Sequence, residues 1–311
     1  MERARILFMS SSSFGLAPLR DIIKSNHNIL AVYSNSLKKS GRGLKYNKSV
    51  IHSLAEEHDI QIRTSSNLNT KDEIKFIEDL NIDLGIVVSY GKIIPEIFLS
   101  KSKYGFLNIH PSLLPRWRGA APIQRALMNG DKSTGVNIIR LDPGIDTGDI
   151  CLTSEVAINK DDNYGRLSLT LSEIGAKLII EAINKTMSGE INFIKQSNAN
   201  IFYADKIHKN ETKISFNQNA IEVNNLIRGL SPSPGAWFST LIKNNETRVK
   251  ILDAQIVDAD GLPGQILDEK LLIACKKNAI RPITLQKEGK KQMNLDDFLR
   301  GNEIRKGTKI T

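Results

Sequence analysis

The sequence predicts an α/β protein: a Rossmann-like, mainly parallel sheet domain followed by a smaller, OB-like β-barrel domain. Two observations support this. In the first half of the chain, short apolar runs typical of strands alternate with amphipathic helical patterns, which indicates a parallel sheet with helices on both faces. After about residue 207 the pattern changes to one helix and about five short strands, which is typical of a small barrel.

The alternation in the first half can be followed segment by segment. Strands are expected in the runs "RILFMS", "ILAVYS", "QIRTS", "IDLGIVVSY", "GFLNIH" and "TGVNIIRLD". Helices are expected at 15–25, 49–58 and 71–80, with a short one in "KIIPEIFLS". Because ligands of such sheets bind beyond the carboxyl ends of the strands, the residues that follow each strand are the first candidates for a site.

A long helix and a linker are predicted to end the first domain. The helix is expected at about 163–187, where apolar side chains recur every three or four residues and form one buried stripe, at Leu167, Leu171, Ile174, Leu178 and Ala182. Residues 190–206 are polar without a helical period, which indicates an extended linker. The predicted domains are therefore 1–189 and 207–311, joined by 190–206.

The second domain begins with a helix in "NQNAIEVNNLIRGL", which has Ala220, Val223, Ile227 and Leu230 on one face. A proline-rich turn, "SPSPGAW", follows it. Short strand-like runs then come at "WFSTLI", "VKILDAQIV", "GQILD", "LLIACK" and "PITLQ".

Composition limits the class of protein. Of the 311 residues, 40% are hydrophobic and 25% charged, as in an ordinary soluble globular protein. The start, "MERARILFMSSSS", has too short an apolar run for a secretory signal, and no stretch approaches about 18 apolar residues, so we expect a cytoplasmic protein with no membrane partner. Cys151 and Cys275 lack metal-ligand spacing, so neither a metal site nor a disulfide framework is expected.

The net charge of +9 favours a polyanionic partner, because basic side chains attract phosphates and release their counterions. Charge alone does not decide this point, since many lysine-rich proteins never touch nucleic acid. No exposed apolar stripe calls for a second subunit, and a monomer is expected.

The segment "LNIHP" carries the first candidate site. By the two-residue period of a strand, Leu107 and Ile109 lie on one face, and Asn108 and His110 lie together on the other. Pro111 cannot continue the ladder, so the strand ends there. An amide donor and an imidazole are thus expected side by side at the carboxyl end of a buried strand.

A glycine-rich loop after the next predicted strand, "LDPGIDTGDI", offers Asp142, Asp146 and Asp149. If consecutive elements are neighbours, this loop lies at the carboxyl edge of the sheet near His110. A lone histidine or loop aspartate is more often structural, but the combination fits acyl transfer to an amine. Asn and protonated His stabilise a developing oxyanion, and a carboxylate accepts or relays the proton of the amine.

Other common enzyme classes lack their motifs. "FMSSSSF" after the first strand is not a dinucleotide-binding G-x-G-x-x-G, and the chain contains neither G-x-x-x-x-G-K-[ST] nor G-x-S-x-G. The sequence therefore does not support an NAD enzyme, a P-loop nucleotidase or a serine hydrolase.

The run "NIHPSLLPRWRGAAPIQ" followed by "LDPGIDTGD" resembles the formyltransferases that use 10-formyltetrahydrofolate. The segments "YADKI", "NLIRGLSPSPGAW" and "GLPGQIL" extend the resemblance to nearly the whole chain and to the members that act on initiator methionyl-tRNA. It implies that the methionine amino group attacks the formyl carbon. Asn108 and His110 would stabilise the oxyanion, and Asp146 would set the charge of His110 and help remove the proton.

The resemblance also implies a folate site and no metal. The family's "SLLPxxRG" segment corresponds to Ser112, Leu113, Leu114 and Pro115, with Gly119 at its end, and the strand-end segment that lines the pterin pocket includes Val88, Tyr90 and Gly91. No metal or nucleotide cofactor is required, because the formyl group arrives already activated on N10 of 10-formyltetrahydrofolate.

Two basic regions are candidates for binding tRNA. The resemblance leads us to expect a basic loop that enters the acceptor arm, and "LKKSGRGLKYNK" at 37–48 supplies Lys38, Lys39, Arg42 and Lys45. The end of the chain forms a basic run that includes Lys287, Lys290 and Lys291, which suits a tRNA backbone.

One segment departs from the family pattern. Where the family usually has Gly-Thr-Pro after the first strand, this chain has Ser10-Ser11-Ser12. If that glycine has a positive φ, Ser10 is strained by about 1 kcal/mol or the loop changes shape.

Two alternatives stay open: an N-formyltransferase acting on an amino sugar, which would not need the basic regions, and an RNA-binding or folate-binding protein that has lost activity.

Overall fold

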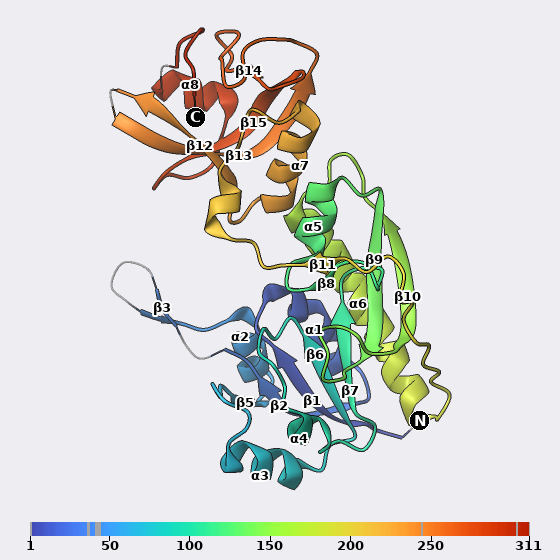
Figure 1. The fold of residues 1–311 in the computed structure, drawn as a ribbon. Helices are drawn as coiled ribbons and strands as arrows, with labels where there is room; N and C mark the ends of the chain where they lie inside the picture. The colour runs from blue at the N-terminus through green and yellow to red at the C-terminus, as the bar shows by residue number, and fades with distance from the viewer. Residues whose placement is uncertain (1, 36–37, 41–44, 244, 303, 311) are drawn as a thin grey trace. The chain divides into compact units, whose positions relative to one another are not determined.

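The computed structural model describes residues 2–35, 38–40, 45–243, 245–302 and 304–310, with the backbone alone at 38–40 and 45–47. The chain divides into two compact units (Figure 1). The first comprises Met1–Pro122, Thr134–Val156 and Ser168–Ala204, and the second comprises Ile123–Ser133, Ala157–Leu167 and Asp205–Thr311.

A seven-stranded sheet in the order β10-β9-β7-β6-β1-β2-β5 forms the centre of the first unit. The pairs β1–β2, β1–β6, β2–β5 and β6–β7 are parallel, whereas β9 runs antiparallel to β7. Its strands are β1 (Arg5–Ser10), β2 (Asn28–Tyr33), β5 (Gln61–Arg63), β6 (Leu84–Val88), β7 (Phe106–His110), β9 (Ser133–Arg140) and β10 (Ile150–Ala157). Small two-stranded pairings join β3 (Lys38–Ser40) to β4 (Lys45–Asn47) and β8 (Arg118–Gly119) to β11 (Tyr203–Ala204).

The helices of the first unit follow the predicted alternation. They are η1 (Ser13–Gly15), α1 (Leu16–Lys24), α2 (Val50–Glu57), α3 (Lys71–Leu80), α4 (Glu96–Leu99) and most of α6 (Tyr164–Met187). Side-chain caps fix their starts: Oγ1 of Thr70 accepts a hydrogen bond from the backbone N–H of Glu73, and Oγ of Ser49 accepts one from that of His52.

Close packing of α6 against β7 fixes which face of the strand is polar. A Cβ built on Gly175 of α6 would lie 2.7 Å from Cγ2 of Ile109, so only glycine allows this approach. Ile109 and Leu107 therefore face the helix and are buried. Asn108 and His110, at the alternate positions, lie on the other face of the sheet.

The antiparallel direction of β9 corrects one step of the sequence argument. Arg140 pairs with Leu107 and Asn137 with His110, so the end of β9 lies near the start of β7. The predicted proximity of the following glycine-rich loop to His110 is observed, since Asp146 lies 3.4 Å from its ring. The reason given for it, that the preceding strand ends at the carboxyl edge of the sheet, is wrong. Residues 141–149 leave from the other end, where the N–H of Leu141 donates to the carbonyl of Phe106, and reach Asn108 across the polar face.

The three serines after β1 form a turn without left-handed backbone. Ser10 is still part of β1 and pairs with Val88, and Ser12 has a φ of −131° and caps η1. Ser11 donates its hydroxyl hydrogen to the carbonyl of Tyr90 at 2.8 Å. The strain considered for Ser10 is therefore absent, because Ser10 keeps the extended backbone of β1 and not a positive φ.

The basic segment 37–48 lies between two serines whose hydroxyl groups meet. Oγ of Ser34, at the end of β2, is 2.9 Å from Oγ of Ser49, which precedes α2. Lys38 and Lys39 lie in β3 and Lys45 in β4. The predicted Arg42 lies outside the described residues.

Residues 190–204 are extended and bond to the rest of the first unit. Ile150 and Ile194 exchange backbone hydrogen bonds of 2.9 Å, and β11 pairs with β8 so that Ala204 lies opposite Gly119. This part of the predicted linker therefore contributes backbone to the surroundings of the candidate site.

The second unit is built on a five-stranded antiparallel sheet in the order β12-β13-β15-β14, with β16 paired to β15. Its elements are α5 (Pro122–Asn129), η2 (Lys209–Thr212), α7 (Ala220–Leu230), β12 (Ala236–Ile242), β13 (Asn245–Val257), β14 (Ile273–Ala274), β15 (Ala279–Lys287), β16 (Met293–Asn294) and α8 (Leu295–Gly301). As predicted, Val223, Ile227 and Leu230 of α7 are buried in the core of this unit.

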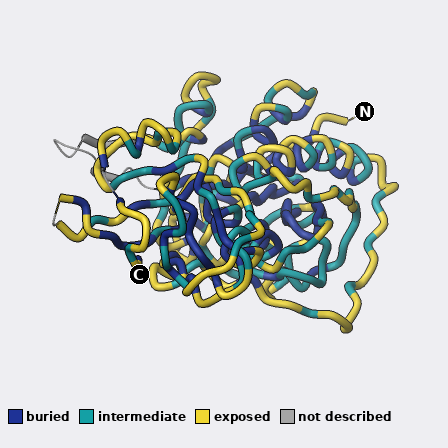
Figure 2. Tube along the Cα trace, turned by 90° about the horizontal axis from the view of Figure 1, so that it is seen from above, coloured by how far each residue is buried: buried dark blue, intermediate teal, exposed yellow. Residues whose placement is uncertain are grey.

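The fold class predicted from the sequence is confirmed: a mainly parallel α/β sheet comes first and an antiparallel sheet domain second. The helices α5 and α8 and the strand β10 were not predicted. Buried residues, dark blue in Figure 2, include all five residues of β6 and all five of β7. Within the part of the chain that is described, no helix is both long and apolar enough to cross a bilayer.

Candidate active site

Asn108, His110 and Asp146 meet on the polar face of β7. Nδ2 of Asn108 donates to Oδ1 of Asp146 at 3.3 Å, and Nδ1 of His110 lies 3.4 Å from Oδ2 of the same carboxylate. Asn108 and His110 are 8% and 3% exposed. The structure thus brings together the three residues singled out in the sequence, whereas Asp142 accepts hydrogen bonds from the nearby Thr147 and Gly144 within its own loop.

Each ring nitrogen of His110 faces an acceptor. Nε2 lies 3.0 Å from the carbonyl oxygen of Trp117, while Nδ1 faces the Asp146 carboxylate. A neutral imidazole has one N–H and can satisfy only one of these acceptors, but the protonated ring has two. The ring is therefore placed to donate to both acceptors when each of its nitrogens carries a proton.

The backbone around the triad is held in unusual conformations. Asp146 and Trp117 have φ values of 51° and 65°, in the left-handed region that residues with a Cβ seldom adopt. Gly119 has a φ of 119°, and a Cβ there would lie 3.0 Å from the carbonyl oxygen of Ala204. This conformation lets the N–H of Gly119 donate to Oδ2 of Asp146 at 2.8 Å. Such strain is a common feature of functional sites.

Gln196 and Arg118 hold the loop that carries Asp146. Nε2 of Gln196 donates to the carbonyl oxygens of Asp146 and Gly148, each at 2.8 Å. The buried Arg118 donates to Oε1 of Gln196 from Nε at 3.1 Å and from Nη2 at 2.7 Å. Because both ends of the Gln196 amide are bonded, its orientation is fixed, and so is the loop backbone.

Asn137 orients the other side of the site. It lies opposite His110 on β9, and its Oδ1 accepts a hydrogen bond of 2.7 Å from the backbone N–H of Leu114. Its Nδ2 donates to Oγ1 of Thr153 at 2.6 Å. Asn137, Arg118 and Gln196 were not among the site residues predicted from the sequence. Asn137 could have been found from its place on the polar side of a buried strand, but Gln196 lies in a polar segment that carries no such signal.

The predicted folate residues fall into two groups. Leu113, Leu114 and Pro115 are half-buried and offer apolar surface beside the triad, and Gly91, with a φ of 72°, and Gly119 offer backbone. Val88, Tyr90 and Ser112 are buried, and the Ser112 hydroxyl donates to the carbonyl of Arg116 at 2.7 Å. The first group suits a flat, largely apolar donor, whereas the second could contact it only through backbone groups.

Of the predicted tRNA-binding lysines in the second unit, two are exposed. Lys290 and Lys291 follow β15 in a turn. Lys287 is half-buried and donates from Nζ to Oδ1 of Asn302 at 3.2 Å. Lys290 and Lys291 are therefore the better placed to meet a phosphate.

A second polar cluster links β2, β5 and α3 and includes none of the triad residues. Tyr33 donates its hydroxyl hydrogen to Glu73, which also accepts two hydrogen bonds from Arg63. Burial opposes the charge on Glu73, but the bonds from Arg63 and Tyr33 outweigh it and hold the pKa of this carboxyl below its usual value. Burial raises the pKa of Tyr90 to about 12, and its hydroxyl has no hydrogen-bond partner among the described residues.

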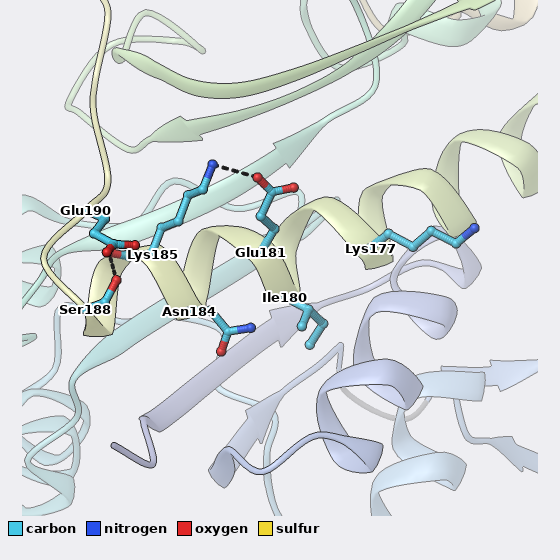
Figure 3. A pocket seen from close by; sticks show the side chains of 7 residues that line it. All are labelled: Lys177, Ile180, Glu181, Asn184, Lys185, Ser188 and Glu190. Atoms are coloured by element: carbon cyan, nitrogen blue, oxygen red, sulfur yellow. Dashed lines mark hydrogen bonds and ion pairs between the residues drawn. The ribbon is translucent and has the colours of Figure 1, made fainter. Parts of the chain in front are cut away.

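Two other features of the first unit do not resemble a catalytic centre. Figure 3 shows a hollow beside the end of α6, where Lys185 and Glu181 form an ion pair of 2.7 Å and Lys177, Ile180 and Asn184 complete much of the lining. Its charges neutralise one another.

Burial raises the pKa of the Cys151 thiol to about 11, so this residue stays protonated at neutral pH. Among the described residues no cluster of His, Cys, Asp or Glu is arranged to hold a metal ion.

Comparison with known proteins gives two family matches and a set of full-length relatives. Residues 4–183 match the model of the formyl transferase family, and residues 206–303 match that of the formyl transferase C-terminal domain. A methionyl-tRNA formyltransferase of Chelativorans sp. (strain BNC1) is 40% identical over 99% of both chains. One from Sinorhizobium medicae (strain WSM419) is 43% identical over 96% of this chain and 97% of its own.

Solved structures share the fold at lower identity. An N-formyltransferase from Helicobacter canadensis, in complex with folinic acid and dTDP-3-aminofucose, superposes with a TM-score of 0.66 at 21% identity and covers 92% of this chain and 100% of its own. HypX from Aquifex aeolicus in complex with tetrahydrofolic acid gives 0.66 at 17% identity over 96% of this chain and 47% of its own. With the first family model matching more than half of the chain, and relatives at this identity along its whole length, the protein belongs to the formyl transferase family.

Proposed function

We propose that this protein transfers the formyl group of 10-formyltetrahydrofolate to the free amino group of methionine on initiator methionyl-tRNA. The observation that carries the proposal is the 40–43% identity to methionyl-tRNA formyltransferases, which runs through both family matches rather than the first alone. The meeting of Asn108, His110 and Asp146 supports it, since these groups suit acyl transfer to an amine.

Charge placement in the triad explains how the residues act on this reaction. As the amine attacks, the formyl oxygen gains negative charge, and Asn108 and the protonated His110 donate hydrogen bonds to it. Asp146 balances the charge of His110 and accepts the proton that the amine loses. The bond from the formyl carbon to N10 then breaks, and the proton that Asp146 took from the amine passes to N10, which leaves the carboxylate ionised again. The donor supplies an activated formyl group, so no metal is required.

The observed contacts set a condition on this mechanism. Both nitrogens of His110 already face acceptors, so donation from Nε2 to the formyl oxygen replaces or shares the contact with the Trp117 carbonyl. Nδ2 of Asn108 carries a second N–H besides the one directed at Asp146. Asn108 is therefore ready to donate at once, whereas the His110 ring acts after a small adjustment, as catalytic groups in unliganded sites often do.

The remaining assignments belong to the same proposal. Residues 1–189 form the catalytic domain, 190–206 the linker and 207–311 the domain that binds the tRNA backbone. The folate donor lies against Leu113, Leu114, Pro115 and the backbone of Gly91, and the acceptor stem meets the 37–48 segment. Because tRNA and folate are both dissolved in the cytoplasm, the protein works there and needs no membrane partner. It acts as a monomer in this proposal.

A direct assay tests the proposal against an amino-sugar acceptor. Purified protein is mixed with 10-formyltetrahydrofolate and either aminoacylated initiator tRNA or a nucleotide-linked amino sugar. Formylation of the tRNA, followed as acid-precipitable formylmethionine, is the expected result. Formyl transfer to the sugar alone would contradict the proposal. Transfer to neither the tRNA nor the sugar would favour an inactive binding protein.

A further inference from the structure

An arginine that contacts two neighbouring aromatic rings lies next to the candidate catalytic histidine. The guanidinium carbon of Arg116 is 4.5 Å from the centre of the Trp117 ring and 4.4 Å from that of the Phe202 ring. The two rings are 5.9 Å apart and inclined at 48°. We call Arg116, Trp117 and Phe202 the aromatic cluster. None of the site residues assigned above belongs to it.

The aromatic cluster is accessible on the side of Phe202. Phe202 is 44% exposed and its neighbour Tyr203 is 58% exposed, so two aromatic side chains in a row are left in contact with water. Backbone hydrogen bonds fix their position, because the N–H of Arg118 donates to the carbonyl of Phe202 at 2.9 Å and Ala204 pairs with Gly119. Backbone hydrogen bonds, rather than packing in the core, thus keep these aromatic side chains at the surface.

A hydrogen bond connects the aromatic cluster to the triad. The carbonyl oxygen of Trp117 faces Nε2 of His110 at 3.0 Å. An aminoacyl group is joined to the last nucleotide of tRNA through an ester on its ribose. When the amine lies at His110, only the ester link and one ribose separate it from the terminal base, and the cluster includes Trp117, the residue whose carbonyl contacts His110.

We propose that the aromatic cluster binds the 3′-terminal adenine of the aminoacylated tRNA, with the exposed part of the Phe202 ring as the stacking surface. This inference rests on the proposed function. Aromatic rings are the usual stacking partners of unpaired bases, and the guanidinium of Arg116 next to these rings adds positive charge beside the last phosphates.

The position of Phe202 in the chain favours the acceptor over the folate donor. The match to the formyl transferase family, which carries the folate-dependent chemistry, ends at residue 183. The match to the C-terminal domain begins at residue 206. Phe202 lies between the two, on the backbone segment that pairs with β8. A surface contributed from outside the donor-binding segment suits recognition of the acceptor.

Trinucleotide binding tests the proposal without any formyl transfer. The chain has two tryptophans, so a Trp237→Phe variant leaves Trp117 as its sole indole fluorophore. We expect CpCpA to quench this fluorescence, and the same oligomer with an abasic last residue to do so far more weakly. Adding Phe202→Ala should weaken CpCpA binding about tenfold, with Phe202→Leu intermediate. Tyr104→Ala is the matched control, since Tyr104 also lies under a cation, that of Lys103, but precedes β7 at the other end of the strand.

Kinetics give the second measurement. In the otherwise unchanged enzyme, Phe202→Ala should raise the KM for methionyl-tRNA about tenfold and leave the KM for 10-formyltetrahydrofolate at its original value. Equal quenching by the abasic oligomer, or a rise in the folate KM instead of the tRNA KM, would overturn the proposal. If the unaltered protein did not formylate tRNA at all, the proposed function would fail, whereas the CpCpA titration would still decide whether the cluster stacks a terminal base.

Discussion

The carboxylate of Asp146 lies 3.4 Å from Nδ1 of His110, and the backbone N–H of Gly119 donates to the same oxygen at 2.8 Å. The carboxylate thus stands between a side chain that can carry a proton and a fixed backbone dipole. These two contacts fix the position of the Asp146 carboxylate beside the imidazole.

Replacing Asp146 by Asn tests the charge at this point. The amide has the size of the carboxylate but cannot balance a protonated His110 or accept the proton of the amine. We expect kcat to fall by about 10²–10⁴, the range for loss of a general acid or base, while tRNA affinity changes less than twofold. Single-turnover formylation and a filter-binding titration measure the two quantities. An equal loss of tRNA binding would mean that Asp146 holds the fold instead.

Gln196→Met tests the positioning of the Asp146 loop. Methionine fills a similar volume but makes none of the hydrogen bonds that Gln196 makes to Asp146, Gly148 and Arg118. We expect kcat to fall about tenfold with little change in KM. In an Asp146→Asn background the same substitution should add almost nothing, because the group that it positions is gone. Fully additive effects in this double-mutant cycle would contradict a positioning role.

The charge reversals Lys290→Glu and Lys291→Glu, made together, test the second unit as a tRNA platform. Two exposed cations become anions, so tRNA affinity should fall at low salt. The slope of log K against log[salt] should flatten by nearly one for each phosphate that a lysine no longer neutralises. The matched control reverses two exposed lysines of the first unit, Lys24 and Lys71. Were the control to weaken binding as much, the effect would be one of net charge only.

Acid stability gives a prediction that does not depend on function. Burial lowers the pKa of His27 below its ordinary value of 6.5. The neutral ring suits its surroundings, because Nδ1 accepts from the N–H of Ala4 at 3.3 Å and Nε2 faces Oδ1 of Asn184 at 3.1 Å. Protonation would set an N–H on Nδ1 against the Ala4 donor.

The sign of the effect follows from linkage. Below pH 6.5 the unfolded chain binds a proton at His27 that the folded chain does not, so the free energy of unfolding falls with decreasing pH. The slope reaches at most about 1.4 kcal/mol per pH unit until the folded pKa is passed. Urea unfolding between about pH 8 and about pH 5 should show a smaller loss for His27→Gln. Substituting the exposed His58 in the same way should leave the loss unchanged.

The sequence predicts well those site residues that lie on one strand. It predicts less well those that distant segments of the chain bring to the site. Asn108 and His110 can be placed together because strand alternation is local. The position of Asp146 depends on the direction of β9, which no local pattern reveals: the strand is antiparallel, and the loop arrives across the sheet face. Gln196 reaches the site through tertiary packing of a segment without any period, and so lies beyond such prediction.

The missed elements have a similar explanation. The short helix α5 is hidden in the motif "GAAPIQRAL", although Pro122 stands at its first position, as proline often does at helix starts. The serine triplet after β1 is the opposite case, since a departure from a family pattern suggested strain that the backbone does not have. Ser10 remains in extended geometry in β1, where any residue is tolerated.

The bond between the hydroxyl groups of Ser34 and Ser49 has a consequence for how such a protein can diversify. The end of β2 and the start of α2 lie close together. The number of residues between them therefore does not affect the structure of the sheet. Closing a longer or shorter excursion changes the free energy only slowly with length. The stretch from 35 to 48 can therefore vary in length and sequence while β7, which carries Asn108 and His110, stays unchanged.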